Sequence, residues 1–487
     1  MKSRQDPIAL DASELCRLDA ASLAAAYRRK ELSPVEVTQA ALDRAEEIQP
    51  SLNAFTFLDH QGALDAARMA EERWARAEPL SLIDGVPTTL KDIVHVEGWK
   101  VRYGSRATDN RPFHHDAPSV SNLRRAGAVF IGQTTTPEFG WKAVTDSAEY
   151  GITRNPWDPD RTPGGSSGGA AAAAAAGAGV LHLGTDGGGS IRIPASFTGI
   201  VGHKPTYGRV PAYPPSSFGT VAHIGPMART VADVAAMLNA MSGRDRKDWT
   251  QPSEAFPDVS LQEINWTGKR IGYWNTPCVG GVDPEVAAAV DAVMGDLQTA
   301  GAIVTEIALP QQDSLLETFY LFWFVGAANR LSSIDPENHA LLDPGFTNAA
   351  RVGEKYTAVE RMQAELRRAE FGAKMDALLN DYDCIVSPAV PITAFEAGSD
   401  FPAGSGVANS FEWSSFSFPI NLSQQPACSV PCGLSSNGLP IGLQIIGARG
   451  GDAGVLSAAL AYERLYPDRF ISRRGTWPKI NVGSAME

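Results

Sequence analysis

Residues 162–194 read TPGGSSGGAAAAAAAGAGVLHLGTDGGGSIRIP, a segment in which two serines, Ser166 and Ser190, each stand in a glycine-rich turn. Glycine allows a positive φ and a close approach of the backbone to another group, at an entropic cost to folding. The chain accepts this cost twice, each time beside a serine hydroxyl, which indicates that the two turns build a site for a small reactive group. Lys91, in GVPTTLKD, adds an amine. Two serines and a lysine form a nucleophile-and-base set without histidine.

The alanine run at residues 170–176 follows the first glycine turn directly. It predicts a helix packed so closely against its neighbours that only methyl groups fit. Such a helix would hold Ser166 near its N-terminal end, where backbone N–H groups are free. The close packing and the chemistry are therefore expected to occur together.

Outside this segment, helical signals alternate with short apolar runs. Ser33, Pro34 and Glu36 predict a helix start with a capping box, and residues 60–77 predict a second helix. The runs of strand length are residues 128–131, 180–183, 271–274, 303–305, 384–387 and 441–446. This alternation predicts an α/β fold with a mixed central sheet covered by helices on both faces. No Pro-, Gly- or Ser-rich linker divides the chain, so residues 1–487 are expected to form a single large domain.

Composition narrows the class of protein. The chain has 487 residues and a formal net charge of −13, which argues against a nucleic-acid partner because such proteins normally carry a basic face. No apolar run follows the first basic residues, and residues 170–183 are too short to span a bilayer, which takes about 20 apolar residues. Five scattered cysteines fit reduced thiols. These features predict a cytoplasmic protein without a membrane role, a metal site or a cofactor.

An α/β-hydrolase nucleophile elbow is the first alternative, because residues 164–168 match G-x-S-x-G. The elbow requires a strand before it, and three prolines in residues 155–163 exclude a central strand there. It also requires a downstream histidine, but His203, His223 and His339 stand in no recognisable signature. The elbow is therefore rejected.

Lys91 and the two serines together resemble the amidase signature family, and further blocks match in the family's order. These blocks are GVP (85–87), LKD (90–92), GQTTTPEF (132–139), NPW (155–157), GGSSGG (164–169), GTDGGGSIRIPA (184–195), GHKPTYGR (202–209), GPMART (225–230) and GLP (438–440). The resemblance implies the amidase signature fold, with a catalytic core at about residues 80–235 and substrate-pocket segments at about 312–418. It also implies that Ser190 is the nucleophile, Ser166 the bridging serine after a cis Gly165–Ser166 peptide, and Lys91 the base.

The chemistry agrees with these roles. Lys91 can accept a proton only as the neutral amine, and with a reference pKa near ~10.4 it would be almost fully charged unless burial lowers that pKa. Ser166 would relay the proton between Ser190 and Lys91 and return it to the leaving amine. The N–H groups of the three glycines before the nucleophile would converge on the oxyanion. Asp186 and Arg192 are expected to form a supporting shell around this turn, whose glycines are Gly187, Gly188 and Gly189.

The predicted activity is hydrolysis of a carboxylic amide C–N bond through a serine acyl-enzyme, a route that esters and carbamates share. An aromatic run at residues 319–324 predicts a buried helix and, from the resemblance, a pocket for an apolar or aromatic acyl group. The expected partner is a small-molecule amide, with homo-oligomerisation left open.

The alternative is the glutaminase (A) subunit of a tRNA-dependent amidotransferase. That subunit usually has threonine and glutamine where this chain has Gly187 and Ile193. A non-catalytic binding protein is disfavoured because all three catalytic positions are filled. The natural substrate is not fixed by the sequence.

Overall fold

A mixed sheet of eleven strands runs through the residues that the computed structural model describes, which are 12–407, 409–472 and 475–480. The strand order is β1-β3-β2-β6-β8-β7-β12-β13-β11-β9-β10. The strands are β1 (Phe55–Leu58), β2 (Pro87–Lys91), β3 (Val129–Thr134), β6 (Leu181–Asp186), β7 (Val201–Lys204), β8 (His223–Ala228), β9 (Arg270–Tyr273), β10 (Ile303–Glu306), β11 (Cys384–Pro388), β12 (Ala427–Leu434) and β13 (Pro440–Ile446). A separate short pair is formed by β4 (Asp146–Ser147) and β5 (Gly151–Ile152).

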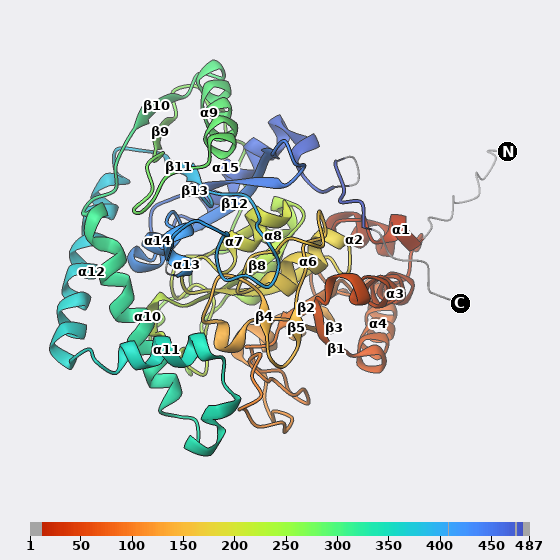
Figure 1. Cartoon of the computed structure of the whole chain (residues 1–487). Coiled ribbons are helices and arrows are strands. Elements are labelled where there is room, and N and C mark those ends of the chain that lie inside the picture. The colour runs from red at the N-terminus through yellow and green to blue at the C-terminus, as the bar shows by residue number, and fades with distance from the viewer. Residues whose placement is uncertain (1–11, 408, 473–474, 481–487) are drawn as a thin grey trace.

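Helices flank this sheet, and Figure 1 shows α1 to α4 at one end of it and α9 to α12 at the other. The helices are α1 (Ala12–Leu15), α2 (Ala20–Arg29), α3 (Pro34–Leu52), α4 (His60–Ala75), α5 (Pro118–Arg125), α6 (Gly168–Ala176), α7 (Arg192–Thr198), α8 (Val231–Met241), α9 (Pro284–Thr299), α10 (Leu315–Leu331), α11 (Pro344–Gly353), α12 (Ala358–Leu378), α13 (Ser410–Trp413), α14 (Phe418–Ser423) and α15 (Asp452–Leu465). The predicted single α/β domain with a mixed, helix-covered sheet is confirmed. In the described part of the chain, none of these helices combines the length and apolar character needed to cross a membrane.

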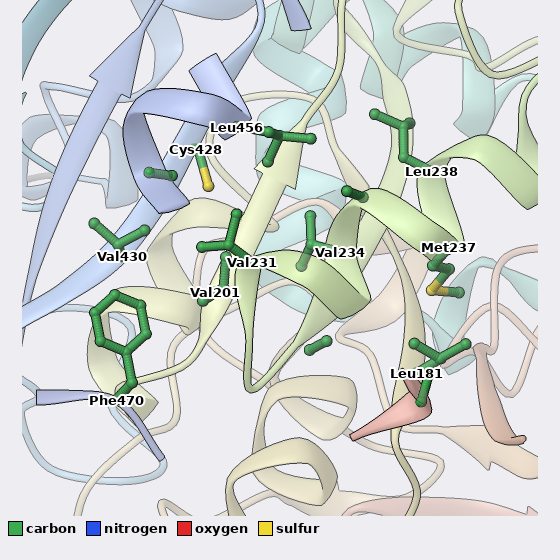
Figure 2. Packing of buried hydrophobic residues seen from close by; sticks show 14 of the residues in the cluster. Leu181, Val201, Val231, Val234, Met237, Leu238, Cys428, Val430, Leu456 and Phe470 are labelled. Atoms are coloured by element: carbon green, nitrogen blue, oxygen red, sulfur yellow. The ribbon is translucent and has the colours of Figure 1, made fainter. Parts of the chain in front are cut away.

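The two faces of the sheet bury different helices because side chains alternate along each strand. Leu181 of β6 and Val201 of β7 belong to the same buried cluster as Val234 of α8 and Leu456 of α15, and Figure 2 shows Leu181 beside Met237 of α8. Met227 of β8 points to the other face and packs with the alanines of α6. Full burial of side chains such as these stabilises the fold by about 1.5–3 kcal/mol each.

Several local predictions are confirmed. The α3 helix begins with the expected capping box, in which Val35 N–H donates to Ser33 Oγ and Ser33 N–H donates to Glu36 Oε2. The aromatic run forms α10, whose Phe319, Phe322 and Trp323 are buried. The apolar runs correspond to β3, β6, β9, β10, β11 and β13.

The sequence did not single out β2, β7, β8 and β12 as strands. The β2 sequence PTTLK is buried at every position, although two of its residues are threonines. The β8 sequence HIGPMA and the β12 sequence ACSVPCGL contain proline and glycine, which ordinarily argue against a strand. Pairing with both neighbours, rather than apolar content, places these segments in the sheet.

Candidate active site

Two neighbouring strands bring the predicted catalytic groups to one edge of the sheet. β2 ends at Lys91 and β6 ends at Asp186, and the two strands run parallel with Leu90 opposite Leu183. Parallel strands present their carboxyl ends at the same edge, so Lys91 and the turn that follows Asp186 lie on the same side. Ser190 lies in this turn, two residues before the start of α7.

The α6 helix brings Ser166 to the same place. All residues of α6 are buried, as its alanine run predicts, and Ser166 lies two residues before its start. A Cβ on Gly169 would lie 2.5 Å from Thr135 N and 2.6 Å from Ala54 O, both backbone atoms, so only glycine fits there. The Gly165–Ser166 peptide bond is cis, which confirms the conformation that the family resemblance implied.

Lys91 lies in a pocket of hydroxyl groups. Its side chain is 0% exposed, and Nζ lies 2.8 Å from Ser166 Oγ, 2.9 Å from Ser167 Oγ and 2.9 Å from Thr185 Oγ1. Burial lowers the pKa of Lys91 well below its usual range, although the charge of Asp186 acts in the opposite direction. The amine is therefore fully desolvated and meets only groups that can both donate and accept a proton.

Ser190 joins this cluster through its backbone. Its carbonyl oxygen accepts a hydrogen bond from Ser167 N–H at 3.1 Å, which holds the two glycine-rich turns together. Within the described part of the chain its hydroxyl has no hydrogen-bond partner, and the residue is 6% exposed. The structure thus brings Lys91 and Ser166 into direct contact, while the Ser190 hydroxyl remains unengaged.

A buried ion pair holds the turn that carries Ser190. The Arg192 guanidinium donates to both carboxylate oxygens of Asp186 at 3.0 Å, and both side chains are inaccessible to solvent. Burial opposes ionisation of Asp186, but Arg192 outweighs it and keeps the pKa of this carboxyl below its usual range. Gly189 N–H and Ile191 N–H also donate to the same carboxylate, at 2.8 and 3.2 Å. The four bonds fix the path of the chain into Ser190.

The three glycines of this turn differ from one another. Gly189 has a φ of +128° and donates its N–H to Asp186, so this N–H is engaged and does not point freely to an oxyanion as expected for all three glycines. The N–H groups of Gly187 and Gly188 have no partner among the described residues. Aromatic rings lie against these two glycines: a Cβ on Gly187 would lie 2.9 Å from Trp323, and one on Gly188 would lie 3.0 Å from Phe319 and 3.1 Å from Phe411. The two glycines whose N–H groups are unengaged therefore lie against a ring-lined wall formed by Phe319, Trp323 and Phe411.

Sequence reasoning missed five residues of this site. Ser167 and Thr185 lie inside the glycine-rich blocks, so their hydroxyls could have been found there. The others are Ser417, Asn421 and Gln444, whose side chains or backbone contact Arg192, Asp186 or the glycine turn. They lie more than two hundred residues away along the chain, and no local pattern marks them.

Comparison with known proteins shows what this chain is similar to. The Amidase family model matches residues 36–456. A relative from Myxococcus xanthus (strain DK1622), the A subunit of a glutamyl-tRNA(Gln) amidotransferase, is 35% identical over 482 residues, which is 93% of this chain and 98% of the relative.

Two solved structures have the same fold. A bacterial aryl acylamidase of the amidase signature family has a TM-score of 0.85 and 29% identity, and covers 93% of this chain and 96% of its own. The A subunit of the glutamyl-tRNA(Gln) amidotransferase of Thermotoga maritima has a TM-score of 0.79 and 29% identity over 98% of this chain and 100% of its own.

One prediction is wrong. The expectation that excluded nucleic acid and limited the partners to a small-molecule amide conflicts with relatives that are subunits of an enzyme named for a tRNA. The error came from net charge, which sums the whole surface and does not describe a local patch or a neighbouring subunit.

Proposed function

This chain belongs to the amidase signature family, and we propose that it cleaves a carboxylic amide through an acyl-enzyme on Ser190, with Ser166 as proton carrier and Lys91 as base. The observation that carries this proposal is the Lys91 pocket, where a fully buried amine meets three hydroxyl groups and the nearest belongs to Ser166. A buried amine with a lowered pKa is the base that a serine nucleophile requires near neutral pH.

The hydrogen bonds around Lys91 support a direction for the proton. The Ser167 hydroxyl donates its one proton to Thr185 O at 3.1 Å, so its oxygen must accept from Lys91. A neutral amine that donates to Ser167 and Thr185 keeps its lone pair for the Ser166 proton. Ser166 can then accept the proton of Ser190 as it gives up its own.

The reaction follows in two halves. Ser190 Oγ attacks the amide carbon while its proton passes to Ser166 and the Ser166 proton passes to Lys91. The oxyanion forms opposite the N–H groups of Gly187 and Gly188, which are the unengaged donors of the turn. The proton then returns through Ser166 to the leaving nitrogen, the C–N bond breaks, and the acyl group stays on Ser190. Water repeats the sequence in the second half and releases the acid.

The relatives favour glutamine as the amide. This chain aligns with 98% of the A subunit of a glutamyl-tRNA(Gln) amidotransferase. That alignment makes it a candidate for the same role, the glutaminase component of a tRNA-dependent enzyme. We therefore propose glutaminase action within such an assembly as the first substrate assignment.

The ring-lined wall favours a second candidate, an apolar or aromatic acyl group. Phe319, Trp323 and Phe411 lie against the two glycines that would hold the oxyanion, so an acyl chain at this place meets rings. The likeness to an aryl acylamidase points in the same direction.

One experiment tests the reaction and separates the two candidates. Wild type and Ser190→Ala are incubated with glutamine, an aryl amide, an aliphatic amide and 4-nitrophenyl butyrate, with and without the other components of an amidotransferase. We expect turnover and an acyl group on Ser190 in the wild type only. Glutamine turnover that requires the other components supports the first candidate, and aryl amide turnover by the chain alone supports the second. Turnover by Ser190→Ala contradicts the nucleophile assignment.

A further inference from the structure

The chain has a second fully buried lysine, Lys204, which is the last residue of β7. Its side chain is 0% exposed, and Nζ donates to the backbone carbonyls of Gln425 at 2.5 Å and Pro205 at 3.2 Å. The third neighbour is Nε2 of His223, at 3.3 Å. None of these three partners is a hydroxyl, so the serine pathway does not include this lysine. Lys204 belongs to the GHKPTYGR block, which the proposed chemistry leaves unexplained.

The His223 ring connects Lys204 to the active site. Its Nδ1 lies 2.8 Å from Val221 O and 3.2 Å from Asp186 O. Both partners are carbonyl oxygens, which only accept, so Nδ1 carries the proton and Nε2 presents a lone pair to Lys204. Burial and the charge of Lys204 hold the pKa of His223 well below its usual range, which agrees with a neutral ring.

The Asp186 carbonyl that His223 contacts belongs to the same peptide unit as Gly187 N–H. In a planar trans peptide the C=O and N–H bonds point in opposite directions, so a fixed carbonyl fixes the direction of the N–H. Asn421 Nδ2 also donates to this carbonyl, at 2.9 Å. Hydrogen bonds to a carbonyl also polarise the N–H of the same unit. His223 and Asn421, which donate to the Asp186 carbonyl, therefore set the direction of Gly187 N–H and make it a stronger donor.

We propose that Lys204 and His223 are positioning residues that act through the Asp186–Gly187 peptide to aim Gly187 N–H at the oxyanion. This inference rests on the proposed amide hydrolysis. Lys204 donates to His223, the Nδ1 proton of His223 is shared between the Val221 and Asp186 carbonyls, and Gly187 N–H on the opposite side of the Asp186–Gly187 peptide meets the developing charge.

The test compares His223→Leu, which removes the donor, with His223→Asn, whose side-chain amide can donate from the position of Nδ1. Lys204→Met is the third variant. His182→Leu is the matched control, because His182 is also fully buried, in the neighbouring strand, but contacts Thr89 and not the glycine turn. Hydrolysis of 4-nitrophenyl butyrate is measured as kcat and KM separately.

We expect His223→Leu to lower kcat about 10-fold to 100-fold. This is less than the loss of about 10²–10³ for removal of an oxyanion donor, because with Asn421 as the remaining donor the peptide rotates only partly and Gly187 N–H is misdirected but still present. KM should change less than kcat, His223→Asn should recover most of kcat, and His182→Leu should retain it. Unchanged kcat in a folded His223→Leu protein overturns the inference.

A crystal structure of His223→Leu supplies a measurement that does not depend on activity. A rotated Asp186–Gly187 peptide supports the inference, and a peptide that keeps its wild-type orientation overturns it whatever the activity. If the wild type does not acylate Ser190, or Ser190→Ala retains turnover, the proposed function fails, and the crystal structure still decides the inference.

Discussion

Lys91 and Lys204 are both fully buried, both end strands of the same sheet, and both have a lowered pKa, yet their surroundings differ. Lys91 meets three hydroxyls, which can give or take a proton. Lys204 meets two carbonyl oxygens and an imidazole nitrogen, which can only accept. Burial lowers the pKa of Lys204 to about 7, and Arg192 adds to this effect. The partners of a buried lysine, more than its burial, therefore distinguish the proposed base Lys91 from the structural donor Lys204.

The largest expected effect is on catalysis, and it concerns Lys91, the proposed base. Lys91→Met should lower kcat by about 10²–10⁴, the usual contribution of a general base, whereas Lys204→Met should lower it by about 10–100. The measurement is steady-state hydrolysis of one substrate by both variants, each checked for folding by circular dichroism. Equal losses in the two variants would contradict the division of roles.

The second prediction concerns stability. Both lysines have a lowered pKa, but only Lys204 donates to backbone carbonyls, so their substitutions should affect the free energy of unfolding differently. Lys204→Met leaves the Gln425 and Pro205 carbonyls without a donor, which costs about 1–3 kcal/mol for each buried acceptor. Lys91→Met should instead raise the free energy of unfolding at pH 7, because burial lowers the pKa of Lys91 and so penalises the charged side chain that the unfolded chain carries.

The sign of the Lys91 effect depends on pH. The folded-state pKa of Lys91 is lowered, so between that value and about 10.4 the unfolded chain binds the extra proton and wild-type stability rises with pH. The advantage of Lys91→Met should therefore shrink as the pH approaches 10. Urea unfolding of both proteins at pH 7 and pH 9.5 measures it, and a constant difference would show that the Lys91 pKa is not lowered.

The smallest expected effect tests whether the hydroxyl groups around Lys91 orient its amine. Thr185→Val keeps the shape of the side chain but removes one partner of Lys91 Nζ, and we expect kcat to fall about 10-fold at unchanged KM. Thr89→Val is the matched control, because its buried hydroxyl contacts His182 and not Lys91. Equal kcat values in the two variants would mean that the pocket does not orient the amine.

The sequence was sufficient for the parts of the molecule whose function lies in local patterns. The glycine-flanked serines and the alanine helix could be predicted because each is written in consecutive residues, whereas the cis peptide was implied by the resemblance to the amidase signature family. Asn421, Ser417 and Gln444 could not, since only the folded sheet brings them to Asp186 and Arg192.

Other sequence predictions failed for physical reasons. Strands such as β2 and β8 were missed because they are not apolar runs. Their backbone N–H and C=O groups pair with strands on both sides, so these segments can be buried without a continuous apolar sequence. The excluded nucleic-acid partner was wrong because net charge describes the whole surface. The boundaries proposed for the catalytic core and pocket segments, and the cytoplasmic location, stay predictions.

The most direct test of the central claim is rapid-quench mass spectrometry of the peptide that contains Ser190 after mixing with 4-nitrophenyl butyrate. The phenolate leaves without a proton, so the experiment isolates the attack step. We predict a butyryl group on Ser190 in the wild type, none in Ser190→Ala, and acylation slowed by about 10²–10⁴ in Lys91→Met. Acylation of another residue, or undiminished acylation of Ser190 in Lys91→Met, would contradict the assignment of Ser190, Ser166 and Lys91.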